Sequence, residues 1–412
     1  MIDTDHIRID IYDQSVEGLD SLLAWWTTFG FDNVRNRFYG EVGNNNQPNE
    51  SATLMVIQRA RILWFFSVVS QKENYSQYKR FADIQYEELV NHFYNENTKG
   101  FFWELDQNYS VLKNRKQSYA QAFCIYALSE YYLLSGNNKV KRLAYETFSM
   151  LESKVWDNVY HGYIEALDHD WSAMEDMRLS DKDQNVPKTM NTHLHIIEAY
   201  TTLCKVTGRQ DVQTSLERVT RLYVDKFYNE KSKGFQLFFD NEWCLCSDII
   251  SYGHDIESSW LLYEAALMID DEIFTTRIKK IALDIVEEVI HSGINIDGAV
   301  KNEVHNMVTD TSYDWWPQAE GVVGFINAYE IDQSKSYLAI AQKCLSFIDQ
   351  HIVDHDHGEW YWKISTDYEV DTTISKSNGW KAPYHNGRMY IEILHRLSNL
   401  ENERSKLTNI II

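Results

Sequence analysis

Segments with helical apolar periodicity recur along the whole chain. They cover residues 54–66, 119–134, 192–205, 256–269, 321–329 and 387–397. A second helix fits into each gap between them, over residues 78–93, 141–155, 212–227, 275–290 and 336–352. The pattern therefore predicts an all-α protein that is built from pairs of helices of ordinary length.

A short turn motif with a glycine separates these helix pairs. The clearest copies are His92-Phe-Tyr-Asn-Glu-Asn-Thr-Lys-Gly100-Phe and Lys226-Phe-Tyr-Asn-Glu-Lys-Ser-Lys-Gly234-Phe. Each copy indicates the end of a helix, a polar turn and a short aromatic strand, as Asn, Asp and Gly favour tight turns. Six such glycines follow one another at intervals of 60 to 72 residues: Gly40, Gly100, Gly162, Gly234, Gly298 and Gly358.

Six helix pairs joined by short β-hairpins predict a closed double ring of helices, an (α/α)6 barrel. No Ser/Gly-rich linker or charge block divides the chain, so we expect one domain over residues 1–412. Residues 4–13 are interpreted as a lead-in, and residues 402–412 as a frayed tail. In such a barrel the inner helices converge on a central cavity, and functional groups are expected near comparable points of those helices.

The net charge of -22 argues against nucleic acid or an anionic membrane as a partner, because both are polyanions. The 13 Trp and 26 Tyr residues exceed what a helical core needs, and they suit a carbohydrate site, where flat rings stack on sugar faces. The N-terminal residues lack a basic region followed by an apolar one, so we expect no secretory signal and a cytoplasmic protein. We expect a monomer or a weak homodimer.

Polar residues that can perform chemistry lie on each predicted inner helix or at its start. His254 and Glu257 are three residues apart and share a helix face, as do Asn191, His195 and Glu198. The other candidates come from different helices or from the loop before one of them: Arg61, Tyr119, Asp183, Trp316, Trp380 and His385.

Three histidines, an arginine and several aromatic rings on one cavity favour proton abstraction from a carbon next to a carbonyl group. Taken singly, Arg61 reads equally well as a surface charge, His195 as a core residue and the adjacent Trp315 and Trp316 as a hydrophobic staple. No His-Glu-x-x-His spacing is present, so a metal site is not predicted. A glycoside hydrolase would need an essential carboxylic acid, and a sugar-binding protein would leave the three histidines unexplained.

These motifs resemble those of the N-acylglucosamine 2-epimerase superfamily, and within it they look most like the cellobiose 2-epimerase branch. The matching stretches run from residue 58 to residue 388 in family order: Gln58-x-x-Arg61-Ile-Leu-Trp64, Tyr119-x-Gln121-Ala-Phe, Asn191-Thr-His-Leu-His195, Tyr252-Gly-His254-Asp-Ile-Glu257, Trp315-Trp316-Pro-Gln-Ala-Glu320 and Trp380-Lys-x-Pro-Tyr-His385-Asn-x-Arg388.

The resemblance implies epimerisation, without a cofactor, at C2 of the reducing-end sugar of an oligosaccharide through a cis-enediolate. It implies that His254 and His385 are the acid/base pair and that Glu257 orients His254. His195 would polarise the carbonyl end and Arg61 would stabilise the enediolate. Trp316 and Trp380 would stack on sugar rings, while Tyr119, Asn191 and Asp183 would bind hydroxyl groups. An aldose–ketose isomerase, an N-acylglucosamine 2-epimerase and a hydrolase on the same barrel are the alternatives.

Overall fold

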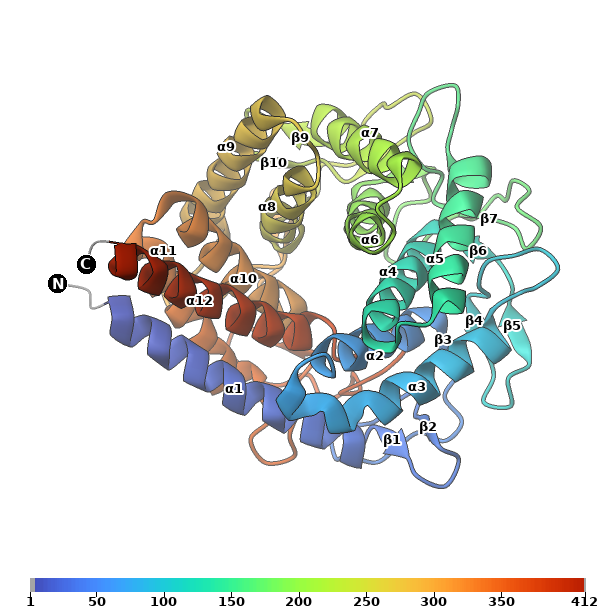
Figure 1. Ribbon diagram of the computed structural model, residues 1–412, viewed down its shortest axis with the longest axis horizontal. Helices are drawn as coiled ribbons and strands as arrows, with labels where there is room; N and C mark the ends of the chain where they lie inside the picture. Colours follow the sequence, from blue (N-terminus) through green and yellow to red (C-terminus); the bar gives the residue numbers. More distant parts are fainter. Residues whose placement is uncertain (1–3, 411–412) are drawn as a thin grey trace.

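Two concentric rings of helices form the computed structural model, which describes residues 4–410 and the side chains of residues 4–398 (Figure 1). Each inner helix packs on its neighbours, and the first five also pack on the outer helix that follows them in the chain. The inner ring consists of α2 (Val56–Val69), α4 (Ser118–Ser135), α6 (Met190–Thr207), α8 (Tyr252–Leu267), α10 (Trp315–Asp332) and α12 (His385–Ile410). The predicted double ring is confirmed.

The outer helices bury one apolar stripe each. Five of them match predicted segments: α3 (Lys79–Glu88), α5 (Asn138–Met150), α7 (Gln210–Lys226), α9 (Glu272–Glu288) and α11 (Lys335–Phe347). Four continue into one π-helical turn that ends the helix: Leu89–Phe93, Leu151–Val155, Val289–Gly293 and Ile348–Ile352. A 3₁₀ segment, Glu73–Tyr78, precedes α3.

The sixth outer helix is α1 (Thr4–Thr28), and it corrects the interpretation of residues 4–13 as a lead-in. Its buried residues Ile11, Ser15, Leu19, Leu22 and Trp26 repeat with helical spacing and face the core. The helix packs against α11 and α12, so the first and last helices lie side by side and close the ring (Figure 1). The backbone of α12 continues to Ile410, so the expected frayed tail is helical up to that residue, and residues 411–412 lie outside the described part.

Within residues 4–410, sixteen short strands lie where an outer helix leads to the next inner helix, at one end of the barrel. They are β1 (Phe31–Asp32), β2 (Arg37–Phe38), β3 (Leu54–Met55), β4 (Glu104–Leu105), β5 (Val111–Lys113), β6 (Lys116–Gln117), β7 (Ala166–Leu167), β8 (Lys188–Thr189), β9 (Tyr228–Asn229), β10 (Gly234–Phe235), β11 (Phe238–Phe239), β12 (Ile250–Ser251), β13 (Glu303–His305), β14 (Val308–Thr309), β15 (Tyr313–Asp314) and β16 (Lys363–Ile364).

Strand pairing ties each repeat to the next one. The strands that directly precede α2, α4, α6, α8 and α10 pair antiparallel with a strand of the following repeat, as β3 with β4 and β12 with β13. The predicted glycine turns are closed locally, by β9–β10 at Gly234 and by single antiparallel bridges at Gly100, Gly162, Gly298 and Gly358. Gly162 has φ 90°, and a Cβ there would lie 2.7 Å from Trp243, so glycine is required.

Within residues 4–410, every helix is too short or too polar to cross a lipid bilayer.

Candidate active site

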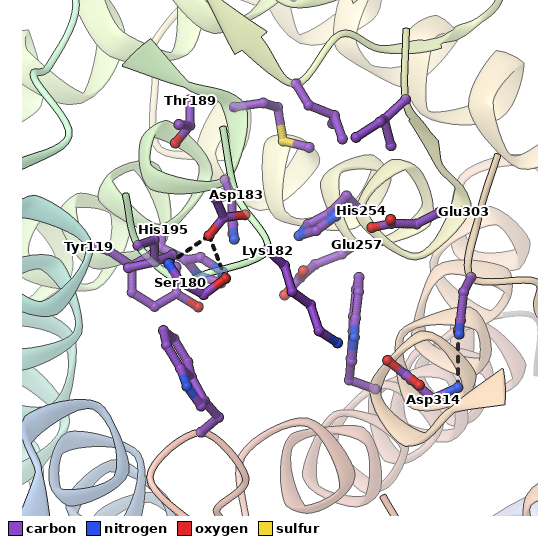
Figure 2. A pocket seen from close by; sticks show the side chains of 18 of the residues that line it. Tyr119, Ser180, Lys182, Asp183, Thr189, His195, His254, Glu257, Glu303 and Asp314 are labelled. Atoms are coloured by element: carbon purple, nitrogen blue, oxygen red, sulfur yellow. Dashed lines mark hydrogen bonds between the residues drawn. The ribbon is translucent and has the colours of Figure 1, made fainter. Parts of the chain in front are cut away.

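A cavity of about 480 Å³ opens at the strand-bearing end of the barrel, where the inner helices begin. Its walls include all ten residues that the sequence nominated: Arg61, Tyr119, Asp183, Asn191, His195, His254, Glu257, Trp316, Trp380 and His385. Figure 2 shows Tyr119 and His195 on one side of the cavity, with His254 and Glu257 on the other. Five of the six inner helices, α2, α4, α6, α8 and α10, start directly after a short paired strand, and this repeated junction aims their first turns at a common centre.

Two of the three cavity histidines contact a buried carboxylate. The Nδ1 atom of His195 lies 2.8 Å from Glu198 Oε2, and that of His385 lies 2.7 Å from Glu320 Oε1. An ionised carboxylate only accepts hydrogen bonds, so each Nδ1 carries the proton and donates it. The remaining nitrogen, Nε2, then offers its lone pair, and each imidazole can act as a base.

His254 contacts a hydroxyl group instead, which corrects the role expected for Glu257. The Nδ1 atom of His254 lies 2.8 Å from Ser251 Oγ. A hydroxyl group can donate or accept, so Ser251 permits both neutral tautomers of His254. Glu257 shares the helix face with His254, but its carboxylate is held by an ion pair with Arg388, and Ser251 orients the imidazole in its place.

One guanidinium group links the carboxylates that lie beneath the site. Arg388 forms short ion pairs with Glu198 and Glu257 and a 2.6 Å pair with Glu320, and all four side chains are buried. The Tyr384 hydroxyl donates to Glu198 Oε1 at 2.6 Å. We refer to Arg388, Glu198, Glu257 and Glu320 as the Arg388 cluster. Three carboxylates share one guanidinium, so the cluster favours a net negative charge.

Arg61 brings a second cation, which lies in the cavity wall itself. Its Nη1 donates to the Trp380 carbonyl oxygen at 2.5 Å, and its Nη2 donates to the Tyr119 hydroxyl at 2.8 Å. Its guanidinium also stacks over the rings of Phe123 and Tyr384 at 4.6 and 4.9 Å. The neutral partners leave the positive charge of Arg61 available to an anion in the cavity.

Trp316 packs between the two histidines that were assigned to proton transfer. Its ring centroid is 4.7 Å from that of His254 and 5.6 Å from that of His385. A Cβ on Gly253 would lie 2.6 Å from the Trp316 ring, so a glycine here makes room for the indole. Trp380 packs edge-on against Trp103, with 5.8 Å between the two ring centroids.

Burial sets the charge state of His254, His385 and Glu257. Desolvation, with a smaller contribution from His195, lowers the pKa of His254 to about 3, and desolvation with Arg61 and Arg388 holds the pKa of His385 well below its usual range. Both imidazoles are therefore neutral at pH 7. Desolvation raises the pKa of Glu257 to about 7, supported by its neighbour Glu320.

Other residues line the cavity without having been nominated from the sequence. A loop supplies Lys182, which extends across the opening in Figure 2, and Ser180, whose N–H and hydroxyl both donate to Asp183 at 2.8 Å. Strand ends supply Asn302, Glu303, Asp310, Asp314, Trp362 and Lys363. These residues lie in loops or in and beside short strands rather than on inner helices, so helical periodicity gives no signal for them.

Three buried side chains at the base of the cavity have the spacing that a metal ion would need. One ligand atom each from Glu257, Glu320 and His385 lies within 4.8 Å of the others. The Arg388 guanidinium already contacts both carboxylates, and His385 donates its Nδ1 proton to Glu320. The residues are thus arranged as an ion-pair network, in which a metal ion would have to displace the guanidinium.

A buried aspartate beside the site gives a testable pH dependence. Asp255 Oδ1 accepts the Phe235 N–H at 2.7 Å, and burial raises the Asp255 pKa to about 8. The folded state then keeps a proton that the unfolded chain releases near pH 4, so the free energy of unfolding falls as pH rises between about pH 4 and pH 8. Asp255→Asn should remove a slope of about 1.4 kcal/mol per pH unit, measured by urea unfolding at pH 5, 6 and 7.

The exposed Asp225, which pairs with Arg277, provides the control. Asp225→Asn should keep the wild-type slope over the same pH range. Identical slopes in wild type and Asp255→Asn would show that Asp255 is ionised in the folded protein.

Known proteins share both the sequence and the fold. The profile of the family described as N-acylglucosamine 2-epimerase (GlcNAc 2-epimerase) matches residues 38–386. The chain is 37% identical over 376 residues to a cellobiose 2-epimerase from Bacteroides fragilis, covering 90% of this chain and 95% of that protein. It is 33% identical to a cellobiose 2-epimerase from Dictyoglomus turgidum, with 92% and 96% covered. The solved structure of cellobiose 2-epimerase from Spirochaeta thermophila superposes with a TM-score of 0.87 at 32% identity, covering 96% of this chain and 98% of that one.

Proposed function

Because the chain belongs to the N-acylglucosamine 2-epimerase family and is an epimerase, we propose that it inverts C2 of the reducing-end glucose of β-1,4-linked disaccharides such as cellobiose and lactose. The product would carry mannose at its reducing end. The observation that carries the proposal is the placement of three histidines, Arg61 and two tryptophans on one cavity. The cavity volume of about 480 Å³ lies in the usual range for small-molecule sites.

The reaction begins with the open-chain sugar, whose aldehyde makes the C2 proton acidic. One of the neutral imidazoles, His254 or His385, takes this proton through Nε2, and the electron pair moves onto the aldehyde oxygen. The product of this step is a planar cis-enediolate with its negative charge on oxygen. Arg61 supports this charge, since a preorganised cation in a site away from water is worth several kcal/mol in the transition state.

Inversion needs a proton on the other face of C2. The second imidazole takes up a solvent proton on Nε2 and, after rotation about the C2–C3 bond, delivers it to C2; the electron pair returns from oxygen to carbon, and the aldehyde is restored. The first imidazolium then releases its proton to solvent, which leaves both histidines neutral again. His195 Nε2 would meet the carbonyl end of the substrate. Trp316 and Trp380 offer ring faces to the sugars, with Tyr119, Asn191 and Asp183 as partners for hydroxyl groups. Over the whole reaction the substrate loses one proton and gains one, and no electron is transferred. The side chains therefore suffice without a redox cofactor.

A hydrolase is the less favoured alternative, because such an enzyme needs a carboxylic acid placed on the glycosidic oxygen. Glu257 and Glu320 face Arg388 in ion pairs, and Asp183 accepts two hydrogen bonds from Ser180. An aldose–ketose isomerase shares the enediolate but returns the proton to C1, and product analysis separates it from an epimerase.

Incubation of the enzyme with cellobiose in D2O tests the proposal. We expect a mannose-type reducing end to appear in the NMR spectrum with deuterium at C2, because the proton passes through an imidazole that exchanges with solvent. A ketose signal would identify an isomerase, and free glucose a hydrolase. The absence of both a mannose-type end and deuterium at C2 would refute epimerisation; running lactose and mannobiose in parallel would rank the substrates.

A further inference from the structure

Arg388 lies on α12, three residues after His385, and does not line the cavity. It nevertheless contacts the partner carboxylates of both His195 and His385. Its side chain is fully buried and packs over the Trp260 and Tyr384 rings at 4.7 and 4.3 Å. The guanidinium is therefore fixed in place behind the catalytic groups, without direct access to the sugar.

The carboxylate of Glu320 meets hydrogen-bond donors only. Its Oε1 accepts both Arg388 Nη2 at 2.6 Å and His385 Nδ1 at 2.7 Å, and its Oε2 accepts the Trp260 indole N–H at 3.1 Å. Glu198 is placed in the same manner, between Arg388, the Tyr384 hydroxyl and His195 Nδ1. Such surroundings suit an ionised carboxylate and disfavour a protonated one, which would have to donate.

We infer that Arg388 is a positioning residue of the reaction: by keeping Glu198 and Glu320 ionised, it fixes the Nδ1–H tautomer of His195 and His385 and leaves their Nε2 lone pairs facing the cavity. This inference rests on the proposed function for its catalytic meaning. Its structural content, the control of two tautomers by one guanidinium, can be measured without any turnover.

Removal of the Arg388 charge would reverse the direction of the hydrogen bond between Glu320 and His385. Burial raises the pKa of Glu320, and Arg388 opposes that rise. Without Arg388, Glu320 would hold a proton at neutral pH and donate it to His385 Nδ1. The proton of the imidazole would then sit on Nε2, where a lone pair is needed to accept the C2 proton. Higher pH would ionise Glu320 again and restore the active tautomer.

Several other charged or titratable groups face Glu320 and His385, and they also contribute to any pH profile of activity. They are Arg61 on α2, His195 and Glu198 on α6, His254 and Glu257 on α8, and Tyr384 just before α12. Among them, Glu198 and Glu257 are bound by the same guanidinium as Glu320. The pH profile of an Arg388 variant must therefore be combined with a direct measurement of the His385 tautomer.

Three variants test the inference: Arg388→Met removes the charge, Arg388→Lys keeps it, and Glu320→Met removes the acceptor while two carboxylates still balance Arg388. At pH 7 we expect kcat to fall by about 10²-fold or more in Arg388→Met and Glu320→Met, with KM changed by less than about threefold. Arg388→Lys should recover part of the lost kcat. Activity of Arg388→Met should rise towards pH 9, and that of Glu320→Met should not.

Arg396 provides a matched control on the same helix. It is also buried, contacts Glu264, Glu330 and Glu392, and packs over Trp260 at 5.6 Å, but it touches no histidine of the cavity. Arg396→Met should lower stability while kcat, the pH profile and the His385 tautomer stay as in wild type.

The decisive readout is ¹⁵N NMR of histidine-labelled enzyme, with the His385 ring assigned through His385→Gln. Wild type should show a protonated Nδ1 and an unprotonated Nε2, and Glu320→Met and Arg388→Met should show a protonated Nε2. An unchanged tautomer in Glu320→Met would overturn the inference even if Arg388→Met failed to fold. If wild type lacked epimerase activity but the tautomers shifted as described, the proposed function would fail and the positioning role would stand.

Discussion

Replacing His254 or His385 by alanine should lower the epimerisation rate by roughly 10²- to 10⁴-fold, the usual contribution of a general acid or base. Both side chains line the cavity and both contact Trp316, so they flank one reacting position. The change is measured as kcat with cellobiose, and circular dichroism checks that the helices remain.

The two variants should differ in the hydrogen exchange that survives. If the histidines serve opposite faces of C2, each variant keeps one working base. One variant should then exchange the C2 proton of cellobiose with D2O, and the other only that of the mannose-ended epimer, each without conversion. Exchange of both epimers in a single variant would show that one histidine acts on both faces.

His193 is the matched control for these variants. It is a buried histidine of α6 whose Nδ1 contacts the Thr189 carbonyl oxygen at 2.7 Å and whose Nε2 accepts the Tyr163 N–H at 2.8 Å, so both nitrogens serve the backbone. His193→Ala should cost stability and retain kcat per folded molecule. Loss of kcat in folded His193→Ala would mean that removal of any buried histidine disables the site.

Lys381→Met should be the most destabilising single change at the rim of the site, at about 3–5 kcal/mol, because it leaves a buried carboxylate without its cation. The Lys381 ammonium group contacts Glu359 and donates to the Trp360 and Lys376 carbonyl oxygens at 2.7 and 2.8 Å. Both charged side chains are completely buried. The urea midpoint should fall, and activity should be lost at a lower temperature, since this segment leads from Trp380 into His385.

An exposed ion pair provides the comparison. Lys280 pairs with Asp284 at 2.5 Å, but its side chain is 77% exposed. Lys280→Met should therefore leave the urea midpoint close to that of wild type. If both lysine variants unfolded at the same urea concentration, burial would not be what makes the Lys381–Glu359 pair important.

The repeating helices could be read from the sequence because each inner helix and each glycine turn carries its own local pattern. The first outer helix was missed, although Ile11, Ser15, Leu19, Leu22 and Trp26 have helical spacing. Its first ten residues include three aspartates among the apolar positions, and its partners α11 and α12 come from the other end of the chain. Local periodicity identified the repeats, but it did not show that α1, which was not counted among the helix pairs, closes the ring.

The candidate site was predictable as a set of residues but not as a network. Position on an inner helix was enough to nominate His195, His254 and His385. Spacing along α8 also suggested that Glu257 orients His254, whereas Glu257 binds Arg388 from α12 and Ser251 contacts the imidazole. Such pairings depend on how side chains from different helices meet, and no interval within one segment encodes them.

Closure of the ring has a consequence for synthesis on the ribosome. Arg61 donates to the carbonyl oxygen of Trp380 across 319 positions of the chain, and α1 packs against α12. A nascent chain can form its early helix pairs while later ones are still being translated, but the wall that holds Trp380 and His385 is added last. Helix formation can therefore proceed throughout translation, whereas a complete sugar cavity exists only once the final helix has joined the first.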